Sequence, residues 1–270
     1  MKIFIDSANI KEIEEVESYG ILDGVTTNPS LIKQALSRKS VNIEQYIKEL
    51  LKIVKKKPVS LEVVGTDFKE MVKEGRILHK KFGKLGNIYV KIPVNPCLEE
   101  KCSKDADGIK AIKELAKNRI SINCTLIFTP EQALLAAKVG AKIVSPFTGR
   151  EDDYLREMDR MSFKKEDYFP EYGIKRFMQA VDDNGIVSGV DLIRKCVEIF
   201  KIHKIKAEIL AASIRNARQF REVALVGADI ATIPISVIKE ILKHCKTAEG
   251  MRRFTADVVK DYADLMGKDK

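Results

Sequence analysis

The chain has 270 residues, 32% of them charged, and 48 Lys and Arg against 39 Asp and Glu give it a formal net charge of +9 at pH 7. This length gives a large core to one domain spanning residues 1–270, and the charge favours phosphorylated or otherwise acidic partners. The basic residues are spread without interleaved aromatics and no apolar run approaches the ~20 residues of a membrane span, so neither nucleic-acid binding nor membrane insertion is favoured.

Short runs rich in β-branched residues alternate along the chain with segments whose apolar residues recur at spacings of three and four. Eight such runs predict strands, at residues 2–8, 24–29, 59–64, 88–93, 121–128, 142–147, 207–213 and 230–234. Helical segments follow them; one is marked by Thr129 as a cap, Pro130 at the first position and Gly140 as a stop. Eight strand-then-helix units predict a single (β/α)8 TIM barrel. An open doubly wound sheet is the alternative, but no GxGxxG or GxxxxGK[ST] turn follows any strand.

The cysteines, at positions 97, 102, 124, 196 and 245, are odd in number and irregular in spacing. They do not predict a disulfide scaffold, and they favour the cytosol. Zinc ligands have paired spacings with histidine partners, which these cysteines lack, so no metal site is predicted. Met1 leads directly into the strand-like "KIFID" without a signal sequence, which also favours a cytoplasmic protein.

Polar residues gather in or just beyond the C-terminal halves of the predicted strands. They are Asp6, Thr27, Asn28, Glu62, Lys91, Asn123, Thr125, Ser145, Arg150 and Ser213. Active sites of TIM barrels lie at the C-terminal ends of the strands, so these side chains are predicted to converge on one mouth. A lone Ser or Thr there is more simply a hydrogen-bonded core residue. An Asp, a Glu and a Lys together would otherwise form a buried charge network without a use.

Lys91 stands in the apolar run "NIYVKIPVNP" (87–96), where a charged ammonium is costly if the strand is buried on both faces. A lysine held in an apolar wall near other cations has a lowered pKa, and its neutral amine can attack a ketone to form a Schiff base. The resulting iminium lets a neighbouring carbon-carbon bond break or form if a carboxylate moves the hydroxyl proton. Asp6 and Glu62 are the candidate carboxylates, and loss of either should cost ~10² to 10⁴-fold in rate.

The arrangement resembles the transaldolases and fructose-6-phosphate aldolases, class I aldolase barrels with an unusually early Schiff-base lysine. The resemblance runs over most of the chain and is carried by "FIDSAN" (4–9), "DGVTTNPSLI" (23–32), "LEVV" (61–64), "VKIP" (90–93), "INCTLIFTPEQALLAAKVGA" (122–141), "VSPFTGR" (144–150), "LAASIRN" (210–216) and "GADIATIP" (227–234). It implies a cytoplasmic enzyme of the pentose phosphate pathway that acts on sugar phosphates without a cofactor.

The resemblance also implies roles for individual residues. Lys91 is similar to the Schiff-base lysine and Asp6 to the acid-base residue that handles the substrate hydroxyl. Glu62 and Thr125 are similar to the pair that holds the catalytic water. The dihydroxyacetone end would be bound by residues of the same mouth, namely Asn28 and Ser145, with Thr27 and Asn123 beside them.

Arg150, Ser213 and Arg215 resemble the family's phosphate site, where a guanidinium gives forked, charge-assisted hydrogen bonds. Arg215 alone could be a surface cation. In "AASIRN", directly after a strand and before a helix N-terminus, an anion site is the better interpretation. A sugar with another acidic tail, such as a sulfonate, would fit the same arginines.

Two positions discriminate within the family. Aldolases that release a free three-carbon ketone resemble one another in having glutamine where this chain has Glu62 and tyrosine where it has Phe147. A phenylalanine would leave the three-carbon enamine waiting for an aldehyde acceptor, so transfer is favoured over net cleavage. A fructose-6-phosphate aldolase is the runner-up. A barrel that has lost catalytic activity and only binds sugar phosphates is the non-enzymatic alternative.

Three segments depart from the small family members. The loop after Pro93 is long and polar, and residues 151–188 form an enlarged connection rich in aromatics. Residues 247–270 form a C-terminal helical extension with one apolar stripe, Met251, Phe254, Val258, Tyr262 and Leu265. The stripe packs on its own barrel or on a neighbouring subunit, and the resemblance implies a homo-oligomer.

Overall fold

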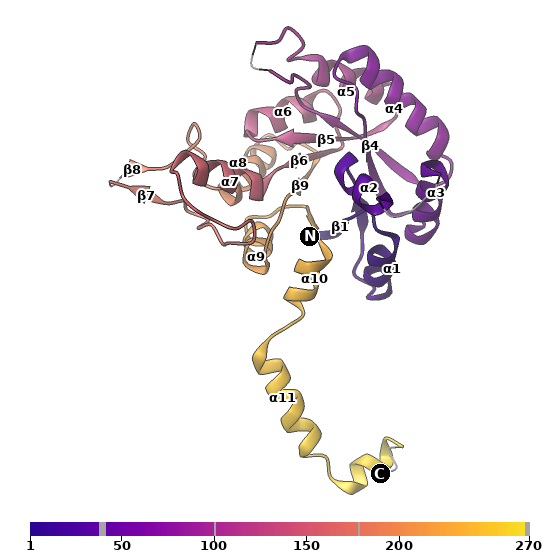
Figure 1. Cartoon of the computed structure of the whole chain (residues 1–270), viewed down its shortest axis with the longest axis vertical. Coiled ribbons are helices and arrows are strands. Elements are labelled where there is room, and N and C mark those ends of the chain that lie inside the picture. The colour runs from indigo at the N-terminus through magenta and orange to yellow at the C-terminus, as the bar shows by residue number, and fades with distance from the viewer. Residues whose placement is uncertain (38–41, 100, 178, 268–270) are drawn as a thin grey trace.

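The protein is a closed barrel of parallel strands surrounded by helices (Figure 1). A computed structural model describes residues 1–37, 42–99, 101–177 and 179–267. The strands follow one another around the barrel in the order β1-β10-β9-β6-β5-β4-β3-β2. Their bounds are β1 (Lys2–Asp6), β2 (Gly24–Thr26), β3 (Pro58–Glu62), β4 (Asn87–Pro93), β5 (Ser121–Ile127), β6 (Ile143–Pro146), β9 (Glu208–Ala211) and β10 (Ile230–Ile233). The predicted eight-stranded barrel is confirmed.

Ten helices of the described chain cover the barrel, and the one for which the sequence predicts a cap, at Thr129, starts where expected. They are α1 (Ile10–Ser18), α2 (Pro29–Leu36), α3 (Ile43–Val54), α4 (Phe68–Phe82), α5 (Asp107–Lys117), α6 (Pro130–Lys138), α7 (Thr148–Met158), α8 (Gly189–Ile202), α9 (Ala217–Leu225) and α10 (Ile235–Ile241). At α6, Thr129 forms a capping box with Gln132 and Pro130 opens the helix. Gly140, just past the end, has φ +109°, a conformation that side chains other than glycine rarely adopt.

Apolar side chains fill two separate regions. The larger core lies between the strands and the helices and includes Val25, Val90 and Ile122, all fully buried. The smaller one, here called the interior plug, fills the inside of the barrel and consists of Phe4, Ile143, Phe147, Leu210, Ala212 and Ile230. Gly24 is required beside this plug, because a Cβ there would lie 2.5 Å from the Phe4 ring. The inside of the barrel is therefore packed with apolar side chains, and the functional polar side chains lie at the C-terminal ends of the strands.

The connection after the sixth barrel strand is shorter than predicted, because residues 151–158 continue helix α7. The irregular part runs from residue 159 to 188 and contains a two-stranded antiparallel hairpin, β7 (Lys175–Arg176) with β8 (Gln179–Ala180). Figure 1 shows the hairpin projecting from the barrel beside α7 and α8.

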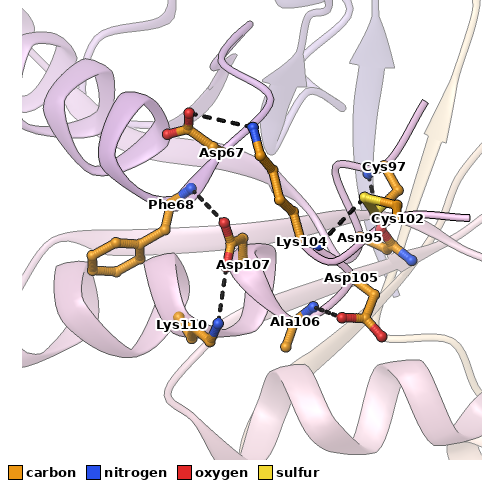
Figure 2. The surroundings of a disulfide bond; sticks show 10 residues. All are labelled: Asp67, Phe68, Asn95, Cys97, Cys102, Lys104, Asp105, Ala106, Asp107 and Lys110. Atoms are coloured by element: carbon orange, nitrogen blue, oxygen red, sulfur yellow. Dashed lines mark hydrogen bonds and ion pairs between the residues drawn. A yellow bond between two sulfur atoms is a disulfide. The ribbon is translucent and has the colours of Figure 1, made fainter. Parts of the chain in front are cut away.

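The loop after β4 contains a disulfide between Cys97 and Cys102, which the odd cysteine count did not predict. Around it, the Lys104 amide donates to the Cys102 sulfur and the Lys104 ammonium lies 3.7 Å from Asp67 (Figure 2). The Phe68 amide, in the first turn of α4, donates to Asp107 in the first turn of α5. The long loop is thereby tied to the start of the neighbouring helix.

The C-terminal segment leaves the barrel altogether. Helices α11 (Cys245–Ala256) and α12 (Lys260–Leu265) extend away from it as an arm, with no buried residue in either helix (Figure 1). The prediction of one continuous stripe is wrong at Val258, which lies between the two helices. Packing on its own barrel is also wrong, since Phe254 is 70% exposed and Leu265 is 76% exposed.

Within the described part of the chain, none of the helices has the length and apolar character that crossing a membrane requires.

Candidate active site

Lys91 lies near the C-terminal end of β4 and is 6% exposed. Parallel pairing sets Glu62 of β3 beside it on one side and Asn123 of β5 beside it on the other. The Lys91 Nζ atom is 3.1 Å from Glu62 Oε2 and donates a hydrogen bond to the Thr27 carbonyl at 3.4 Å. Strand register therefore brings together three of the predicted residues, Lys91, Glu62 and Asn123, and the hydrogen bond from the ammonium adds Thr27 as a fourth.

Asp6 ends β1 on the same rim of the barrel. The Thr26 hydroxyl donates to Asp6 Oδ1 at 2.7 Å and shares a second hydrogen bond with the Thr232 hydroxyl at 2.6 Å. Burial raises the pKa of the Asp6 carboxyl, while the hydrogen bond from Thr26 and the charge of Lys91 oppose that rise. Asp6 is thus a carboxyl held in a fixed orientation, in a setting that makes it a better proton acceptor than an exposed aspartate.

A buried hydrogen-bond chain orders the neighbouring amide and hydroxyl groups. The Ser145 hydroxyl donates to Asn123 Oδ1 at 2.6 Å, and Asn123 Nδ2 donates to the Ser60 hydroxyl at 3.0 Å. The Thr27 hydroxyl in turn donates to the Ser60 carbonyl at 2.8 Å. Three predicted site residues are therefore held in place through Ser60, which the sequence did not single out.

Thr125 is fully buried, and its hydroxyl has no hydrogen-bond partner among the residues that the structure describes. It lies opposite Pro93 in the register of β4 and β5. The next residue, Leu126, has φ +57°, at the point where the pairing of β5 with β6 shifts register. A buried hydroxyl without a protein partner is suited to hold a water molecule.

A small cavity of about 80 Å³ lies at the mouth of the barrel, and Lys91, Asp6 and Ser145 line it, whereas the predicted residues Glu62, Thr27, Asn123 and Thr125 do not. Its polar lining comes from the predicted residues Asp6, Asn28, Lys91, Ser145, Arg150 and Ser213 and from Thr26 and Thr232, which the sequence did not single out. Leu210 and Ala212 give it an apolar side, together with the predicted Phe147. Asn28 also caps α2, accepting a hydrogen bond from the Leu31 amide at 2.9 Å.

The arginine side of the site is built on α7 and on the turn after β9. The Arg150 guanidinium lies 5.1 Å from the Phe147 ring centroid. Arg215 donates through Nε to the Ser213 carbonyl and hydroxyl, both at 3.2 Å. Ser213 has φ +61°, a strained conformation for a residue with a side chain. Both arginines line an outer chamber of about 690 Å³, and Arg150 lines the inner cavity too.

Gly149 allows helix α7 to lie close to the turn after β9. A Cβ at that position would lie 2.2 Å from the Ser213 carbonyl oxygen and 2.6 Å from Arg215 Nε. The Gly149 amide donates to the same carbonyl at 3.1 Å. The glycine in "TGR" thus lets helix α7 lie directly against the turn that carries Arg215.

Two carboxyls are buried behind the arginines on α7. Both oxygens of Glu151 lack hydrogen-bond partners among the described residues, and burial, with the charges of Asp183 and Asp152, raises the pKa of Glu151 to about 8. Asp152 accepts from the Gly189 amide and from Gln219, yet burial raises its pKa to about 7. No pattern in the sequence marked these residues as buried.

The sequence also missed Thr26, Thr232 and Asp153. The two threonines could have been predicted, because both stand within recognised motifs, Thr26 as the last residue of β2 and Thr232 one position before the end of β10. Asp153 was not, because its relation to Arg215 depends on how α7 meets the turn after β9. Among the described residues, no group of three or more His, Cys, Asp or Glu side chains is placed to hold a metal ion.

The fold and the site together define a (β/α)8-barrel protein with a lysine-centred polar cavity at the C-terminal ends of its strands. Residues 3–267 match the family described as Transaldolase/Fructose-6-phosphate aldolase, and the chain belongs to this enzyme family.

Similarity to curated relatives extends over nearly the whole chain. It is 42% identical over 260 residues to a "Probable transaldolase" of Thermoplasma acidophilum, with 95% of each chain covered. It is 38% identical over 257 residues to one of Exiguobacterium sibiricum, covering 95% of this chain and 97% of the relative. A Clostridium botulinum "Probable transaldolase" is 37% identical over all 270 residues of both chains.

Proposed function

We propose that the protein is a transaldolase-type transferase that moves a dihydroxyacetone unit from a ketose phosphate to an aldose phosphate through a Schiff base on Lys91. The donors would be fructose 6-phosphate or sedoheptulose 7-phosphate, in the pentose phosphate pathway. The observation that carries the proposal is the buried Lys91 ammonium, 3.1 Å from Glu62, in a cavity shared with Asp6 and Arg150.

The first step forms the Schiff base. Lys91 passes an ammonium proton to the Glu62 carboxylate, and the neutral amine adds to the C2 carbonyl of the ketose. The carbinolamine then loses its hydroxyl as water, with Glu62 returning the proton, and a protonated imine is left on Nζ. Glu62 is suited to both transfers because it is the carboxylate nearest to Nζ, on the adjacent strand.

The second step breaks the C3–C4 bond. Asp6 accepts the proton of the C4 hydroxyl, C4 becomes the aldehyde carbon that leaves, and the bonding electron pair moves into the iminium to give an enamine. The raised pKa of the Asp6 carboxyl suits it to take up this proton and return it. Asn28 and Ser145, which line the same cavity, would hold the hydroxyls of the three-carbon unit.

The third step is the reverse, with a different aldehyde. The enamine carbon attacks the acceptor carbonyl, the new C4 oxygen takes the proton from Asp6, and water hydrolyses the iminium to free Lys91. The Thr125 hydroxyl, buried and without a protein partner in the described chain, would hold that water together with Glu62.

The acidic end of both sugars would lie at Arg150 and Arg215, which face the outer chamber. Guanidinium groups give an anion paired, charge-assisted hydrogen bonds. Both a phosphate and a sulfonate can accept such hydrogen bonds. The two groups differ in charge and size. We favour phosphate because the family to which the chain belongs is described by a sugar phosphate; the chamber itself combines Arg150, Arg215 and Lys165 with the carboxyl groups of Glu151, Asp153, Glu157 and Asp183.

Phe147 is the residue that favours transfer over cleavage. It lines the cavity with Lys91 and supplies an apolar ring without a hydroxyl that could pass protons to the enamine. The enamine then persists until an aldehyde arrives. An aldolase that releases free dihydroxyacetone is the second candidate, and the same site would serve it.

We further propose that the protein works in the cytoplasm as a homo-oligomer in which the arm formed by α11 and α12 covers a neighbouring subunit. The apolar side chains of the arm are exposed in the single chain, Met251 at 60% and Tyr262 at 52% among them. Large apolar side chains exposed together in one segment are typical of subunit interfaces.

Borohydride reduction in the presence of fructose 6-phosphate tests the proposal. We expect the mass of a reduced three-carbon unit on Lys91 and none on Lys91→Met, with Lys104→Met as a matched control that retains the adduct. Absence of the adduct from the wild type would overturn the enzymatic proposal.

A second measurement separates transfer from cleavage. Without an acceptor aldehyde, a transferase should release about one equivalent of glyceraldehyde 3-phosphate per active site and then stall. Continued release at the rate seen with acceptor would identify the aldolase.

A further inference from the structure

Arg156 is a buried cation near the end of helix α7, and the connection after the helix encloses it. It is 3% exposed. Its guanidinium lies 4.9 Å from the Phe163 ring centroid and 5.0 Å from that of Phe169, and it donates to the Asp167 carbonyl at 2.7 Å. Cation–π contacts and a charge-assisted hydrogen bond of this kind hold a guanidinium firmly. All three partners belong to residues 159–188.

Asp153, one turn earlier on α7, links this cation to the substrate side. Its Oδ1 atom is 3.5 Å from Arg156 Nη1, an ion pair without a hydrogen bond among the described residues, and its Oδ2 atom accepts a hydrogen bond from Arg215 Nη2 at 3.0 Å. One carboxylate thus lies between two guanidinium groups. The side chains are little exposed, at 16% for Asp153 and 20% for Arg215, so solvent screens the interactions only in part.

Arg215 needs such a support because it stands on a turn and not on a strand. The guanidinium is planar, so the hydrogen bonds from Nε to Ser213 leave it one freedom, a swing about the Nε–H direction, and a contact at Nη2 removes that freedom. The backbone of the turn is already tied to α9 through the Arg215 amide and Gln219 at 2.8 Å. The Asp153 contact is therefore the one that sets the direction in which the guanidinium faces the chamber.

We infer that Asp153 and Arg156 are positioning residues that couple the enlarged connection to substrate binding by fixing the Arg215 guanidinium. Phe163, Phe169 and the Asp167 carbonyl hold Arg156, Arg156 holds Asp153, and Asp153 holds Arg215. The connection thereby determines specificity for the acidic end of the sugar without touching the reacting carbons. This inference rests on the proposed function, in which Arg215 binds the phosphate.

A purely structural role for the same ion pairs makes a different prediction. If they only stabilised α7, breaking them would weaken the reaction of every substrate alike. If they position Arg215, the loss falls on substrates that carry a phosphate. The selectivity for fructose 6-phosphate over fructose, measured as the ratio of their kcat/KM values, therefore separates the two roles.

The test uses Asp153→Ala, Arg156→Met and the double variant in the full chain. We expect each single variant to lower the selectivity about tenfold, mainly through a higher KM for fructose 6-phosphate, which corresponds to ~1.4 kcal/mol. The double variant should also lose about tenfold and not a hundredfold, because both changes interrupt one chain of contacts. Arg156→Lys keeps the charge without the fork, and it should lie between the wild type and Arg156→Met.

Arg176→Gln is the matched control. It removes the 2.9 Å contact between Arg176 of the hairpin and Asp159, the residue that follows the last turn of α7, which is an ion pair of the same connection that does not lead to Arg215. Its selectivity should equal that of the wild type.

Three results would overturn the inference: unchanged selectivity in Asp153→Ala, equal losses on both sugars, or multiplicative losses in the double variant. If Arg156→Met does not fold, Asp153→Ala decides, since it leaves every contact of Arg156 with the connection intact. A wild type that forms no borohydride adduct would overturn the proposed function, and the inference with it. A wild type that forms the adduct while the variants keep wild-type selectivity would overturn the inference alone.

Discussion

Lys91, Glu62 and Asn123 stand side by side on three neighbouring strands, whereas Arg150 and Arg215 stand on a helix and on a turn. On the lysine side, backbone pairing fixes the spacing of the functional groups. On the arginine side, ion pairs and one close glycine contact fix it. The difference shows that the groups proposed for the chemistry are set by the barrel. Those proposed for recognition depend on segments outside it.

The largest expected effect is on the lysine side. Asp6→Asn should lower kcat by ~10² to 10⁴-fold, because no other carboxyl lines the inner cavity to accept the C4 hydroxyl proton. The borohydride adduct with dihydroxyacetone should still form, since that step uses Glu62. The control is Asp23→Asn, whose carboxylate accepts from the Ile3 amide at the other end of the same strands. A loss below tenfold would contradict the role of Asp6.

The next effect concerns the free energy of unfolding of the protein, and it comes from Glu151, which is buried behind Arg150. The folded state keeps Glu151 protonated up to about pH 8, whereas the unfolded chain releases that proton above the ordinary value of 4.5. The folded state therefore binds more protons between these values, and stability should fall as pH rises from about 4.5 to 8. Glu151→Gln should remove part of this fall, on the order of a few kcal/mol, and Asp152 and Asp6, whose pKa values burial also raises, should contribute to the remainder.

Thermal unfolding at pH 5 and pH 8.5 measures this difference. We expect Tm to drop more for the wild type than for Glu151→Gln. Glu157→Gln removes an exposed carboxyl from the same helix and is the matched control. Equal drops in the wild type and Glu151→Gln would show that Glu151 does not carry the pH dependence.

A smaller effect is expected at the anion site itself. Arg215→Lys should raise KM for fructose 6-phosphate by ~10 to 100-fold with little change in kcat, because an ammonium cannot reproduce the forked hydrogen bonds. Steady-state kinetics at constant ionic strength measure this, with Arg218→Lys on the next helix as control. A fall in kcat without a rise in KM would place Arg215 in the chemistry and so remove the contrast between the two sides.

The smallest kinetic effect should come from the arm. Deletion of residues 245–270 removes α11 and α12, which lie outside the barrel. We expect kcat to stay within about twofold, while light scattering shows a smaller assembly because the exposed apolar side chains no longer join subunits. An unchanged assembly would show that other surfaces hold the oligomer.

The two sides also differ in how far the sequence could predict them. Lys91, Glu62 and Asp6 stood at the ends of recognisable strands, and a parallel barrel brings such positions together whatever the loops do. Arg150 and Arg215 were found through motifs, but the ion pair with Asp153 was not. It depends on the packing of α7 against a turn 60 residues further along the chain, and hydrophobic periodicity carries no information on such a contact.

The remaining corrections have the same origin. The sequence of α7 is acidic and carries few apolar residues to show a period, so it does not reveal that the helix extends into the predicted connection of residues 151–188. The arm was expected to be one helix because the periodic stripe of Met251 to Leu265 continues across the break at residues 257–259. The Cys97–Cys102 bridge depends on a loop conformation that the four intervening positions do not specify.

Arg150 lines both the inner cavity and the outer chamber, and this shared position constrains the order of events in the proposed cycle. An aldehyde that leaves the lysine and an aldehyde that arrives would pass the same guanidinium, so the two should exclude each other. Double-reciprocal plots of the initial rate against donor concentration, at several acceptor concentrations, should then give parallel lines. Each aldehyde product should compete with the acceptor for the enzyme that carries the three-carbon unit on Lys91. Arg150, which would bind the acidic end of the sugar, would thus also require one aldehyde to leave before the next one binds.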